Sequence, residues 1–428
     1  MREYPKVLII SHNVIGESTN LGKTLFSYFA DWPPDQLCQL YLHEEIPTTS
    51  MCSSYYRVTD FDLVKTLLLL REPGHVVISP KETDHSLVSD NASDTQKIFY
   101  GIAKKPNNFI YFIRNILWGL GTWNNKKLKE WLYKEKPDVI FYAAGDYAFS
   151  FEMVISISKE LRIPIIVSVV DDFYFYNYFG DSPIGIHNKY RFNKSMKRIM
   201  SLCRGAFYIH PKMKEKYDQE FLVPSEVLYP AAMIDETTEP QGKLKISYLG
   251  GLVLDRYKSL IEIGRAIKEI DQKGELLLDV YSPEKTKSII DEMNETNGIR
   301  FNGEISPIEV PRIEKASNIL IIAESCEEKI VNRIKYSLSS KTAEYLGLNR
   351  CIFAYGNTDA GVISYLMEHN AACISTDKRQ LTTKLQEIIN DSKKREEYAA
   401  NGLRLAKMNH SHERNGKVIK EIIFCSIK

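Results

Sequence analysis

The sequence predicts an α/β protein built from two doubly wound domains, each around a parallel β-sheet. Short apolar runs alternate with helix-length amphipathic stretches along almost the whole chain. These runs are continuously apolar, as in parallel strands that helices cover on both faces. The 428 residues, 44% apolar and 26% charged, suffice for two soluble domains with their own cores. Repeated strand–helix alternation of this kind indicates Rossmann-like domains.

The first half of the chain contains four clear strand patterns. They are KVLIIS (6–11), DVIFYA (138–143), IPIIVSVV (163–170) and AFYIH (206–210). Amphipathic stretches between them predict helices over 125–136, 149–161 and 189–203.

The second half repeats the alternation more regularly. Its predicted strands are 245–251, 275–282, 299–303, 318–325, 351–356 and 371–376. Its predicted helices are 257–271, 285–297, 308–316, 340–348, 360–368 and 378–389.

The stretch YPAAMIDETTEPQG (229–242) separates the two series. It is rich in proline and acidic residues and lacks periodicity, so it suits a linker. We expect an N-terminal domain over 1–230 and a C-terminal domain over 231–411, with a last helix in 412–428 packing back on the first domain. Two such domains facing across a cleft would bind ligand beyond the carboxyl ends of their strands.

The overall composition excludes several classes of function. A net charge of +1 gives no reason to expect nucleic acid as a partner. The seven cysteines are dispersed without a C-x-x-C pair, which indicates a reducing compartment and no structural zinc. The first residues do not resemble a signal peptide, and no apolar run reaches membrane-spanning length. We therefore expect a cytoplasmic protein.

The first strand ends at His12 and is followed by IGESTNLGKTLF (15–26), which approaches a phosphate-binding loop. Five residues separate Gly16 from Gly22, where such a loop has four, and the extra residue would disrupt the wrap of N–H groups around one phosphate. A nucleotide kinase or NTPase would depend on this loop alone. Without such a role, the loop either caps a helix that starts near Gly22 or lines the acceptor side of the cleft. In the second case the acceptor would be contacted by small or polar residues: His12, Gly16, Ser18, Thr19 and Asn20.

The strand at 163–170 ends in Asp171 and Asp172. Carboxylates at a strand's carboxyl end suit general-base work or hydroxyl recognition, so both are candidate catalytic residues. The alternative is that one aspartate only stabilises the next turn.

The strand at 245–251 ends in Gly250 and Gly251, and Arg256 and Lys258 follow at the start of a helix. Glycines allow the backbone to approach a ligand, and two cations here can neutralise a diphosphate. Solvated charge is the alternative, although the helix dipole does not favour cations at this end.

A second anion site is predicted where the serines of YSLSSKTAEYL (336–346) precede a helix. Free N–H groups and the positive helix end meet at Ser339, Ser340 and Lys341. Glu344, one turn further on, is suited to a ribose diol, but an acidic residue that merely stabilises the first turn would look the same.

Three segments together resemble the GT-B glycosyltransferases, especially the large retaining family 4 of bacterial polysaccharide biosynthesis. YSLSSKTAEYLGLNRCIFAYG resembles that family's "SK-x-x-EYLA-x-G-x-P-V-x-A" segment. IRFNGEISPIEVPRIEKASNILIIAES and YLGGLVLDRYKSLIEIGRAI resemble its two preceding segments. The resemblance in sequence covers about 245–376. The N-terminal half resembles the family only in its predicted order of strands and helices.

The resemblance implies GT-B architecture and a UDP- or GDP-linked sugar donor held by the C-terminal domain, with no cofactor and no metal. Glu344 would bind the ribose, Arg256 and Lys258 the diphosphate, and Ser339–Lys341 the phosphates or sugar. Tyr336 occupies the place of the first glutamate of the E-x7-E pattern, and Asn349 and Cys351 those of its glycine and proline. The acceptor would be a saccharide or a lipid-linked saccharide. A catalytically degenerate GT-B partner subunit and a GT-B nucleotide-sugar epimerase are the alternatives.

A membrane contact is suggested by FIYFIRNILWGLGTWNNKKLKEWLYKEK (109–136). Its aromatic, apolar start and its lysines suit an element at the inner face of a membrane. An ordinary core helix with a lysine-rich exposed face is the alternative.

Overall fold

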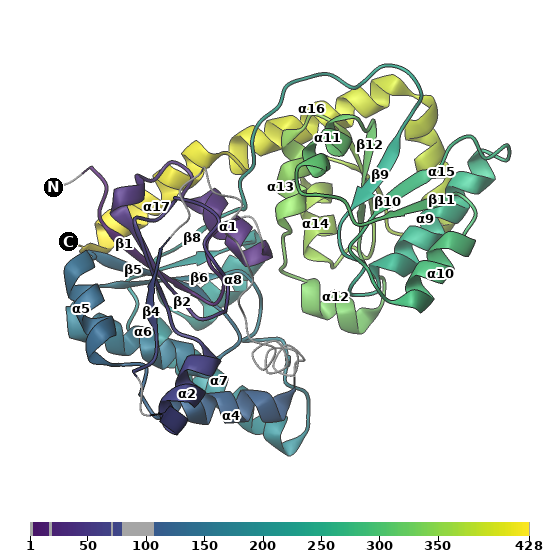
Figure 1. Ribbon diagram of the computed structural model, residues 1–428. Helices are drawn as coiled ribbons and strands as arrows, with labels where there is room; N and C mark the ends of the chain where they lie inside the picture. Colours follow the sequence, from purple (N-terminus) through teal and green to yellow (C-terminus); the bar gives the residue numbers. More distant parts are fainter. Residues whose placement is uncertain (1–2, 17–18, 70–71, 79–106, 428) are drawn as a thin grey trace. The chain divides into compact units, whose positions relative to one another are not determined.

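The structure is a computed structural model that describes residues 3–16, 19–69, 72–78 and 107–427. The chain forms two compact units (Figure 1). Unit 1 comprises Met1–Leu228 and Asn415–Lys428, and unit 2 comprises Tyr229–Arg414. Each unit has a twisted sheet between layers of helices, the arrangement predicted for both halves of the chain.

Unit 1 contains an eight-stranded sheet in the order β4-β3-β2-β1-β5-β6-β7-β8. All neighbouring strands are parallel except β3 and β4, which are antiparallel. The strands are β1 (Val7–Ser11), β2 (Leu37–Tyr41), β3 (Ser54–Arg57), β4 (His75–Val77), β5 (Val139–Ala144), β6 (Ile165–Val169), β7 (Gly205–Tyr208) and β8 (Ser225–Val227). Strands β1, β2, β5, β6 and β7 are buried along their whole length, as expected for parallel strands covered on both faces.

One helix of unit 1 forms within a residue of its predicted bounds at each end, and another does not. The helix predicted over 125–136 forms at Lys126–Glu135, where Asn125 caps it by accepting from the Leu128 N–H at 3.0 Å, and a separate helix, Asn108–Gly119, precedes it. The helix predicted at 189–203 begins earlier, where Ser182 caps it and Pro183 fills its first position. The helices are α1 (Asn20–Tyr28), α2 (Asp60–Leu69), α4 (Asn108–Gly119), α5 (Lys126–Glu135), α6 (Ala148–Leu161), α7 (Pro183–Met200), α8 (Pro211–Glu220) and α17 (His412–Ile427), with a short 3₁₀ turn at Pro34–Gln36.

The end of the chain contributes to the core of unit 1. Ile419 and Ile423 of α17 are fully buried and join the apolar cluster formed by β1, β5 and β7. Unit 1 is therefore built from two separate stretches of sequence.

Unit 2 contains a six-stranded parallel sheet in the order β11-β10-β9-β12-β13-β14. Its strands are β9 (Ile246–Leu249), β10 (Leu278–Tyr281), β11 (Ile299–Gly303), β12 (Ile319–Ala323), β13 (Cys351–Tyr355) and β14 (Cys373–Ser375). In chain order this is the 3-2-1-4-5-6 arrangement of a doubly wound fold, so the direction of winding switches between β9 and β12.

Helices cover both faces of the unit 2 sheet, with α9, α10 and α15 on one side and α11, α13 and α14 on the other (Figure 1). The helices are α9 (Arg256–Ile270), α10 (Lys287–Glu295), α11 (Glu309–Lys315), α12 (Glu328–Ile334), α13 (Ser340–Gly347), α14 (Gly361–Glu368), α15 (Lys378–Asn390) and α16 (Ser392–Asn409).

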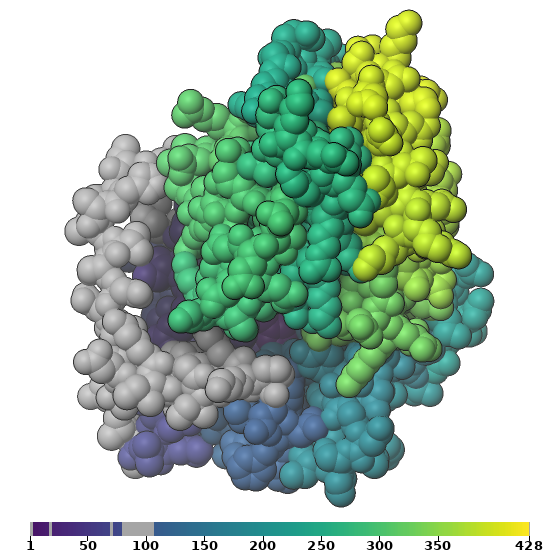
Figure 2. Space-filling view, turned by 90° about the vertical axis from the view of Figure 1, so that its right-hand side faces the viewer, coloured from purple at the N-terminus to yellow at the C-terminus, as the bar shows by residue number. Residues whose placement is uncertain are grey.

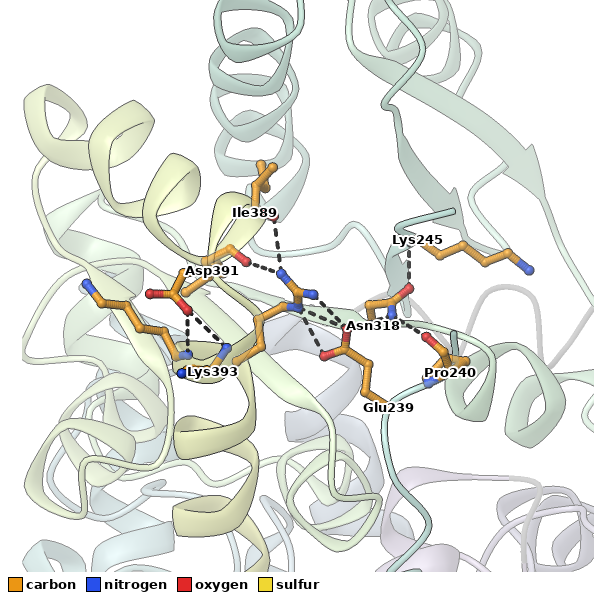
Figure 3. Close-up of polar contacts among 10 residues, drawn as sticks. Glu239, Pro240, Lys245, Asn318, Ile389, Asp391 and Lys393 are labelled. Atoms are coloured by element: carbon orange, nitrogen blue, oxygen red, sulfur yellow. Dashed lines mark hydrogen bonds and ion pairs between the residues drawn. The ribbon is translucent and has the colours of Figure 1, made fainter. Parts of the chain in front are cut away.

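The predicted linker, residues 229–242, has no helix or strand and is fixed to unit 2 by a polar network (Figure 3). The Arg395 guanidinium donates to both carboxylate oxygens of Glu239 at 2.8 to 3.1 Å. The Asn318 amide donates to Glu239 at 2.9 Å and to the Pro240 carbonyl at 2.8 Å. These hydrogen bonds attach Glu239 and Pro240 to unit 2, although the segment has no helix or strand.

Candidate functional sites at the two switch points

The switch point of unit 2 is closed by an ion pair between the elements that follow β9 and β12. Arg256 is the first residue of α9, and Glu324 directly follows β12. The guanidinium donates to the two oxygens of Glu324 at 3.1 and 2.9 Å. The carboxylate raises the pKa of Arg256, so the cation is permanent. Two of the five guanidinium N–H donors are used here, so the others can still meet an anion.

The turn before α9 has an unusual backbone. Leu254 and Asp255 have φ values of +60° and +58°, a left-handed conformation that costs free energy in residues other than glycine. The turn connects Gly250 and Gly251, which follow β9, to the start of the helix. Lys258 donates to the Asp255 carboxylate at 2.8 Å and is about half exposed. The predicted diphosphate cations therefore differ, since Arg256 is held inside the switch point and Lys258 lies at the surface.

The start of α13 lies beside the same strand end. The Tyr345 hydroxyl accepts from the Leu249 N–H at 3.3 Å, which fixes α13 against the last residue of β9. Ser339 caps the helix by accepting from the Lys341 N–H at 3.2 Å, and Ser340 is its first residue. The topology thus brings Gly250, at the end of β9, near the first turn of α13.

Lys341 is not a free cation, because its ammonium group lies between two carboxylates. It contacts Glu314 of α11 at 2.5 Å and Glu344 at 2.9 Å. Glu344 is partly exposed, whereas Glu314 is buried. Lys341 therefore orients Glu344 in the first turn of α13. Tyr336 lies in the turn between α12 and α13 and is partly buried.

Unit 1 has its own switch point, between the parallel strands β1 and β5. His12 follows β1, and Gly145 follows β5. The His12 ring lies so close to Gly145 that a Cβ built there would be 2.5 Å from the imidazole Cδ2. Glycine is therefore required at position 145 for this ring position.

The His12 side chain is buried, and neither ring nitrogen has a hydrogen-bond partner among the described residues. Its ring contacts are aromatic, with Tyr147 at 4.7 Å and His43 at 5.7 Å between ring centroids. Burial, and then the charges of His43 and Arg114, lower the pKa of His12 well below its usual value. The imidazole is therefore neutral at physiological pH, with its hydrogen-bonding capacity unused.

Charged groups from α2 and α4 lie around this histidine. Arg114 pairs with Asp60 at 2.9 Å and stacks on the Tyr147 ring at 3.8 Å. The Tyr111 hydroxyl donates to Asp146, and burial raises the pKa of that carboxyl. A carboxyl, a guanidinium and an unpaired imidazole therefore meet at the carboxyl ends of β1 and β5.

The two candidate catalytic aspartates have different environments at the end of β6. Asp172 accepts from the Phe175 N–H and from the Tyr217 hydroxyl, both at 2.9 Å. Asp172 therefore stabilises the turn, which is the alternative to a catalytic role considered above for one of the two aspartates. Asp171 is exposed. The turn is also held by Lys189, which donates to three backbone carbonyls, and burial lowers the pKa of that lysine to about 8.

The loop after β1 is closed by its own backbone. Thr19 caps α1 by accepting from the Gly22 N–H at 3.1 Å, and Asn20 is the first residue of that helix. The helix therefore begins two residues before the expected Gly22. Gly16 has a φ of +150° and donates its N–H to the Gly22 carbonyl at 3.3 Å. Ser18 lies outside the described residues.

No group of three potential ligands that could hold a metal ion occurs in the described ranges. The D-x-D spacing of Asp60 and Asp62 does not provide one, because Asp60 also accepts from the Trp118 indole at 2.7 Å and Asp62 accepts from Thr59 at 2.9 Å.

Several residues of these sites were not predicted. Gly145 and Asp146 directly follow a strand that the sequence did predict, so the strand-end rule could have found them. Glu314 and Arg114 lie on helices, and nothing in their sequence context indicates a site. Glu324 was noted only as a strand end.

No protein-family model matches the chain, and no curated protein matches its sequence. Solved structures, in contrast, match its fold over nearly full length. A sucrose-phosphate synthase from Thermosynechococcus elongatus superimposes with a TM-score of 0.62 at 10% identity, covering 97% of each chain. A trehalose 6-phosphate synthase from Burkholderia multivorans gives 0.61 at 10% identity, covering 98% of this chain and 96% of that one. HepE of Anabaena, solved in complex with UDP, gives 0.58 at 10% identity, covering 97% of this chain and 98% of that one. The chain therefore has the GT-B fold.

Proposed function

We propose that this protein is a glycosyltransferase that moves a sugar from a UDP- or GDP-linked donor to a hydroxyl group of a saccharide acceptor. The observation that carries the proposal is the fold match, which spans nearly the whole of both chains in a sucrose-phosphate synthase and a trehalose 6-phosphate synthase. HepE was solved with UDP and glucose, and a trehalose-6-phosphate enzyme of E. coli with UDP-2-fluoro glucose. The sequence resemblance of the segments around Arg256 and Glu344 supports the same conclusion from independent information.

The donor would bind at the switch point of unit 2. Breaking the bond between the sugar and the nucleotide leaves negative charge on the diphosphate. Arg256, Lys258 and the N–H groups at Ser339–Lys341 would stabilise that charge without a metal ion. Glu344, oriented by Lys341, would accept hydrogen bonds from the ribose hydroxyls. Gly250 and Gly251 would let the diphosphate approach the backbone, and Tyr336 would line the sugar.

The acceptor would bind on unit 1. His12 is a neutral group whose ring nitrogens have no partner among the described residues, and Asp146 directly follows Gly145, against which the His12 ring lies, so together they can orient a hydroxyl group. Asp171 would contact the acceptor or take its proton, while Asp172 would hold the turn that presents Asp171. Gly16, Thr19 and Asn20 would shape the loop beside His12.

The acceptor would belong to cell-surface polysaccharide or glycoconjugate assembly, free or lipid-linked, and the protein would act in the cytoplasm at the inner face of the membrane. These finer statements depend on the resemblance to bacterial polysaccharide enzymes and on the apolar helix α4.

Calorimetric titration with UDP and with GDP tests the donor site. We expect Glu344→Gln to weaken binding of the preferred nucleotide about tenfold, because one ribose contact loses its charged acceptor. Glu292→Gln, an exposed carboxylate on α10, is the matched control and should bind as the unchanged protein does. Equal affinity in all three proteins would remove Glu344 from the donor site.

A second pair of variants tests the surface cation. Lys258→Ala should weaken binding about threefold, since an exposed charge contributes little. Lys285→Ala removes a more exposed lysine that likewise pairs with a carboxylate, that of Glu304, and it should have no effect.

A catalytically degenerate partner subunit is the second candidate, because Tyr336 replaces the first glutamate of the E-x7-E pattern. Release of UDP or GDP from a panel of nucleotide sugars, with and without saccharide acceptors, distinguishes the two. Tight nucleotide binding without turnover on any donor would favour the degenerate subunit.

A further inference from the structure

Helix α4 buries polar residues together with Trp118 and turns other apolar residues outward. Tyr111, Arg114 and Asn115 point inward and are buried, and Arg114 is the only charged residue of the helix. Phe109, Ile113 and Ile116 lie on the outer side and are 54%, 46% and 47% exposed. A helix of a soluble domain normally turns its apolar stripe toward the core. The inner face of α4 is instead committed to the polar site around Asp60 and Asp146.

The neighbouring helices extend the exposed apolar side of α4. Helix α7 is attached by the Asn188 amide, which donates to the Asn108 carbonyl at 2.8 Å, and by the rings of Phe112 and His187. Figure 2 shows α2, α4 and α7 next to one another at the lower edge of the molecule. We call the exposed apolar side chains of these three helices the α4 surface: Leu67, Leu68, Phe109, Ile113, Ile116, Ile186 and Tyr190, with Leu120 just after α4.

The charged residues of α4 and α7 are all basic, whereas α2 carries Asp60, which pairs with Arg114, and Asp62, which accepts from Thr59. Helices α4 and α7 contain no aspartate or glutamate, although the whole chain has nearly equal numbers of acidic and basic residues. On α7, Ile186, Tyr190 and Lys194 follow one another at four-residue spacing, so the exposed line changes from apolar to basic along the helix. Lys197 and Arg198 pair with Glu220 and Glu152, but Arg191 and Lys194 have no ion pair with any described residue. The surface therefore combines apolar side chains with uncompensated positive charge.

We propose that the α4 surface binds anionic membranes, with α4 lying in the plane of the headgroups and its outer side chains reaching the acyl chains. Exposed aromatic and aliphatic residues flanked by cations without carboxylates complement a layer of anionic lipid. Within the described part of the chain, no helix is both long enough and apolar enough to cross a bilayer, so the contact is peripheral.

A second copy of the same surface is a poorer partner. A two-fold symmetric contact would place these basic residues against one another, with no carboxylate on α4 or α7 to compensate them. The lysine-rich helix α5, which the sequence analysis assigned to the membrane element, is also less suitable. Its Lys126, Lys127 and Lys129 all lie within ion-pair distance of glutamates.

The location of the surface has a consequence for the acceptor, and this step depends on the proposed function. The inner face of α4 supplies Tyr111 and Arg114 to the site at Asp146 and Tyr147. One helix thus separates the membrane-binding side chains from the candidate acceptor site. A saccharide carried on a lipid anchor would reach that site without leaving the membrane.

Flotation with phosphatidylcholine vesicles containing about one third phosphatidylglycerol tests the surface without any nucleotide sugar. The full chain should float with these vesicles and not with pure phosphatidylcholine. Ile113→Asp/Ile116→Asp should lower the bound fraction at least tenfold, because two acidic groups would enter the interface. Lys194→Glu should lower it about fivefold. Leu222→Asp is the matched control, since Leu222 is 99% exposed in unit 1 just after α8 and is not one of the α4-surface residues, and it should float normally.

Three results would overturn the proposal: no flotation of the unchanged chain, unaffected flotation of the double variant, or an equal loss in Leu222→Asp. A fourth result would come from sedimentation velocity without vesicles. If the unchanged chain is a dimer and Ile113→Asp/Ile116→Asp is a monomer, the α4 surface binds a second copy of the chain instead. Circular dichroism and the thermal unfolding of each variant, measured without vesicles, confirm that it is folded, and UDP binding is measured separately. If the chain floats with the vesicles but binds no nucleotide, the membrane-binding proposal is supported and the proposed reaction is contradicted.

Discussion

The switch points of the two units are built differently. In unit 2 the ionic groups are paired, since Arg256 meets Glu324 and Lys341 meets Glu314 and Glu344. In unit 1 the central group, His12, is buried, and neither ring nitrogen has a hydrogen-bond partner among the described residues. Ion pairs therefore hold the first site, whereas the hydrogen-bonding groups of His12 are not used by the part of the chain that the structure describes.

A second buried histidine shows what an ordinary structural role looks like. His410 in unit 2 is fully buried, and its Nδ1 donates to the Pro230 carbonyl at 2.7 Å. Its Nε2 accepts from the Tyr365 hydroxyl at 2.9 Å. Burial lowers the pKa of His410 to about 4, so both histidines are neutral. Because buried polar groups are normally paired, the lack of a described partner at His12 is the observation behind the proposed acceptor-binding role.

The largest expected effect comes from opening the paired site. Arg256→Ala leaves the Glu324 carboxylate, 6% exposed, without its partner, and should destabilise unit 2 by about 3–5 kcal/mol. Hydrogen exchange followed by mass spectrometry should locate the loss in α9 and β12. Arg379→Ala removes an exposed partner of Asp377 and should change no exchange rate beyond its own turn. Similar exchange in both variants would show that the pair does not hold the site.

The two histidines should respond oppositely to the same substitution. His410→Leu removes the donor to the Pro230 carbonyl and the acceptor of the Tyr365 hydroxyl proton, and it should cost about 1–3 kcal/mol of unfolding free energy. His12→Leu removes an unpaired polar group, so stability should stay level or rise while sugar transfer is lost. Urea denaturation and an initial-rate assay measure the two effects. A loss of stability in His12→Leu with normal transfer would make His12 a structural residue.

The smallest effect concerns pH. The folded-state pKa of His410 is about 4 and its unfolded value about 6.5, so below pH 6.5 the unfolded chain binds a proton that the folded chain does not. Stability from this group is therefore complete above pH 6.5 and is lost as the pH falls toward 4, by about 1 kcal/mol between pH 7 and 5.5. The urea midpoints of the unchanged protein and of His410→Leu, compared between about pH 7 and pH 5.5, isolate the contribution of His410 to the pH dependence of stability. A parallel pH dependence in the two proteins would contradict it.

The sequence predicted the second unit better than the first, and the reason is physical. All six strands of unit 2 were predicted, and β12 and β13 are continuous apolar runs, which the pattern predicts directly. In unit 1, β2 was missed because it contains Gln39, a fully buried residue whose amide bonds Ser11 and Ile15. Strands β3, β4 and β8 were missed because they are short, and α8, α12 and α16 because their charged residues conceal the apolar face.

Site residues were predictable only where their position next to a strand end or a helix start could be recognised from the local sequence. Strand ends gave His12, Gly250 and Asp171, and a helix start gave Ser339. The pairing of Arg256 with Glu324 joins residues 68 apart in sequence, and only the strand order makes them neighbours. Likewise, the environment that separates Asp172 from Asp171 comes from Tyr217, 45 residues away.

The most direct test of the central claim is calorimetric titration of UDP and GDP into the full chain, with the nucleotide sugar of the preferred base as the second ligand. The account predicts one site per chain for one of the two nucleotides, weakened about tenfold in Glu344→Gln and unchanged in His12→Leu, because donor and acceptor groups lie on different units. Absence of binding by both nucleotides at millimolar concentration, or a loss of UDP and GDP binding in His12→Leu with Glu344→Gln unaffected, would contradict it.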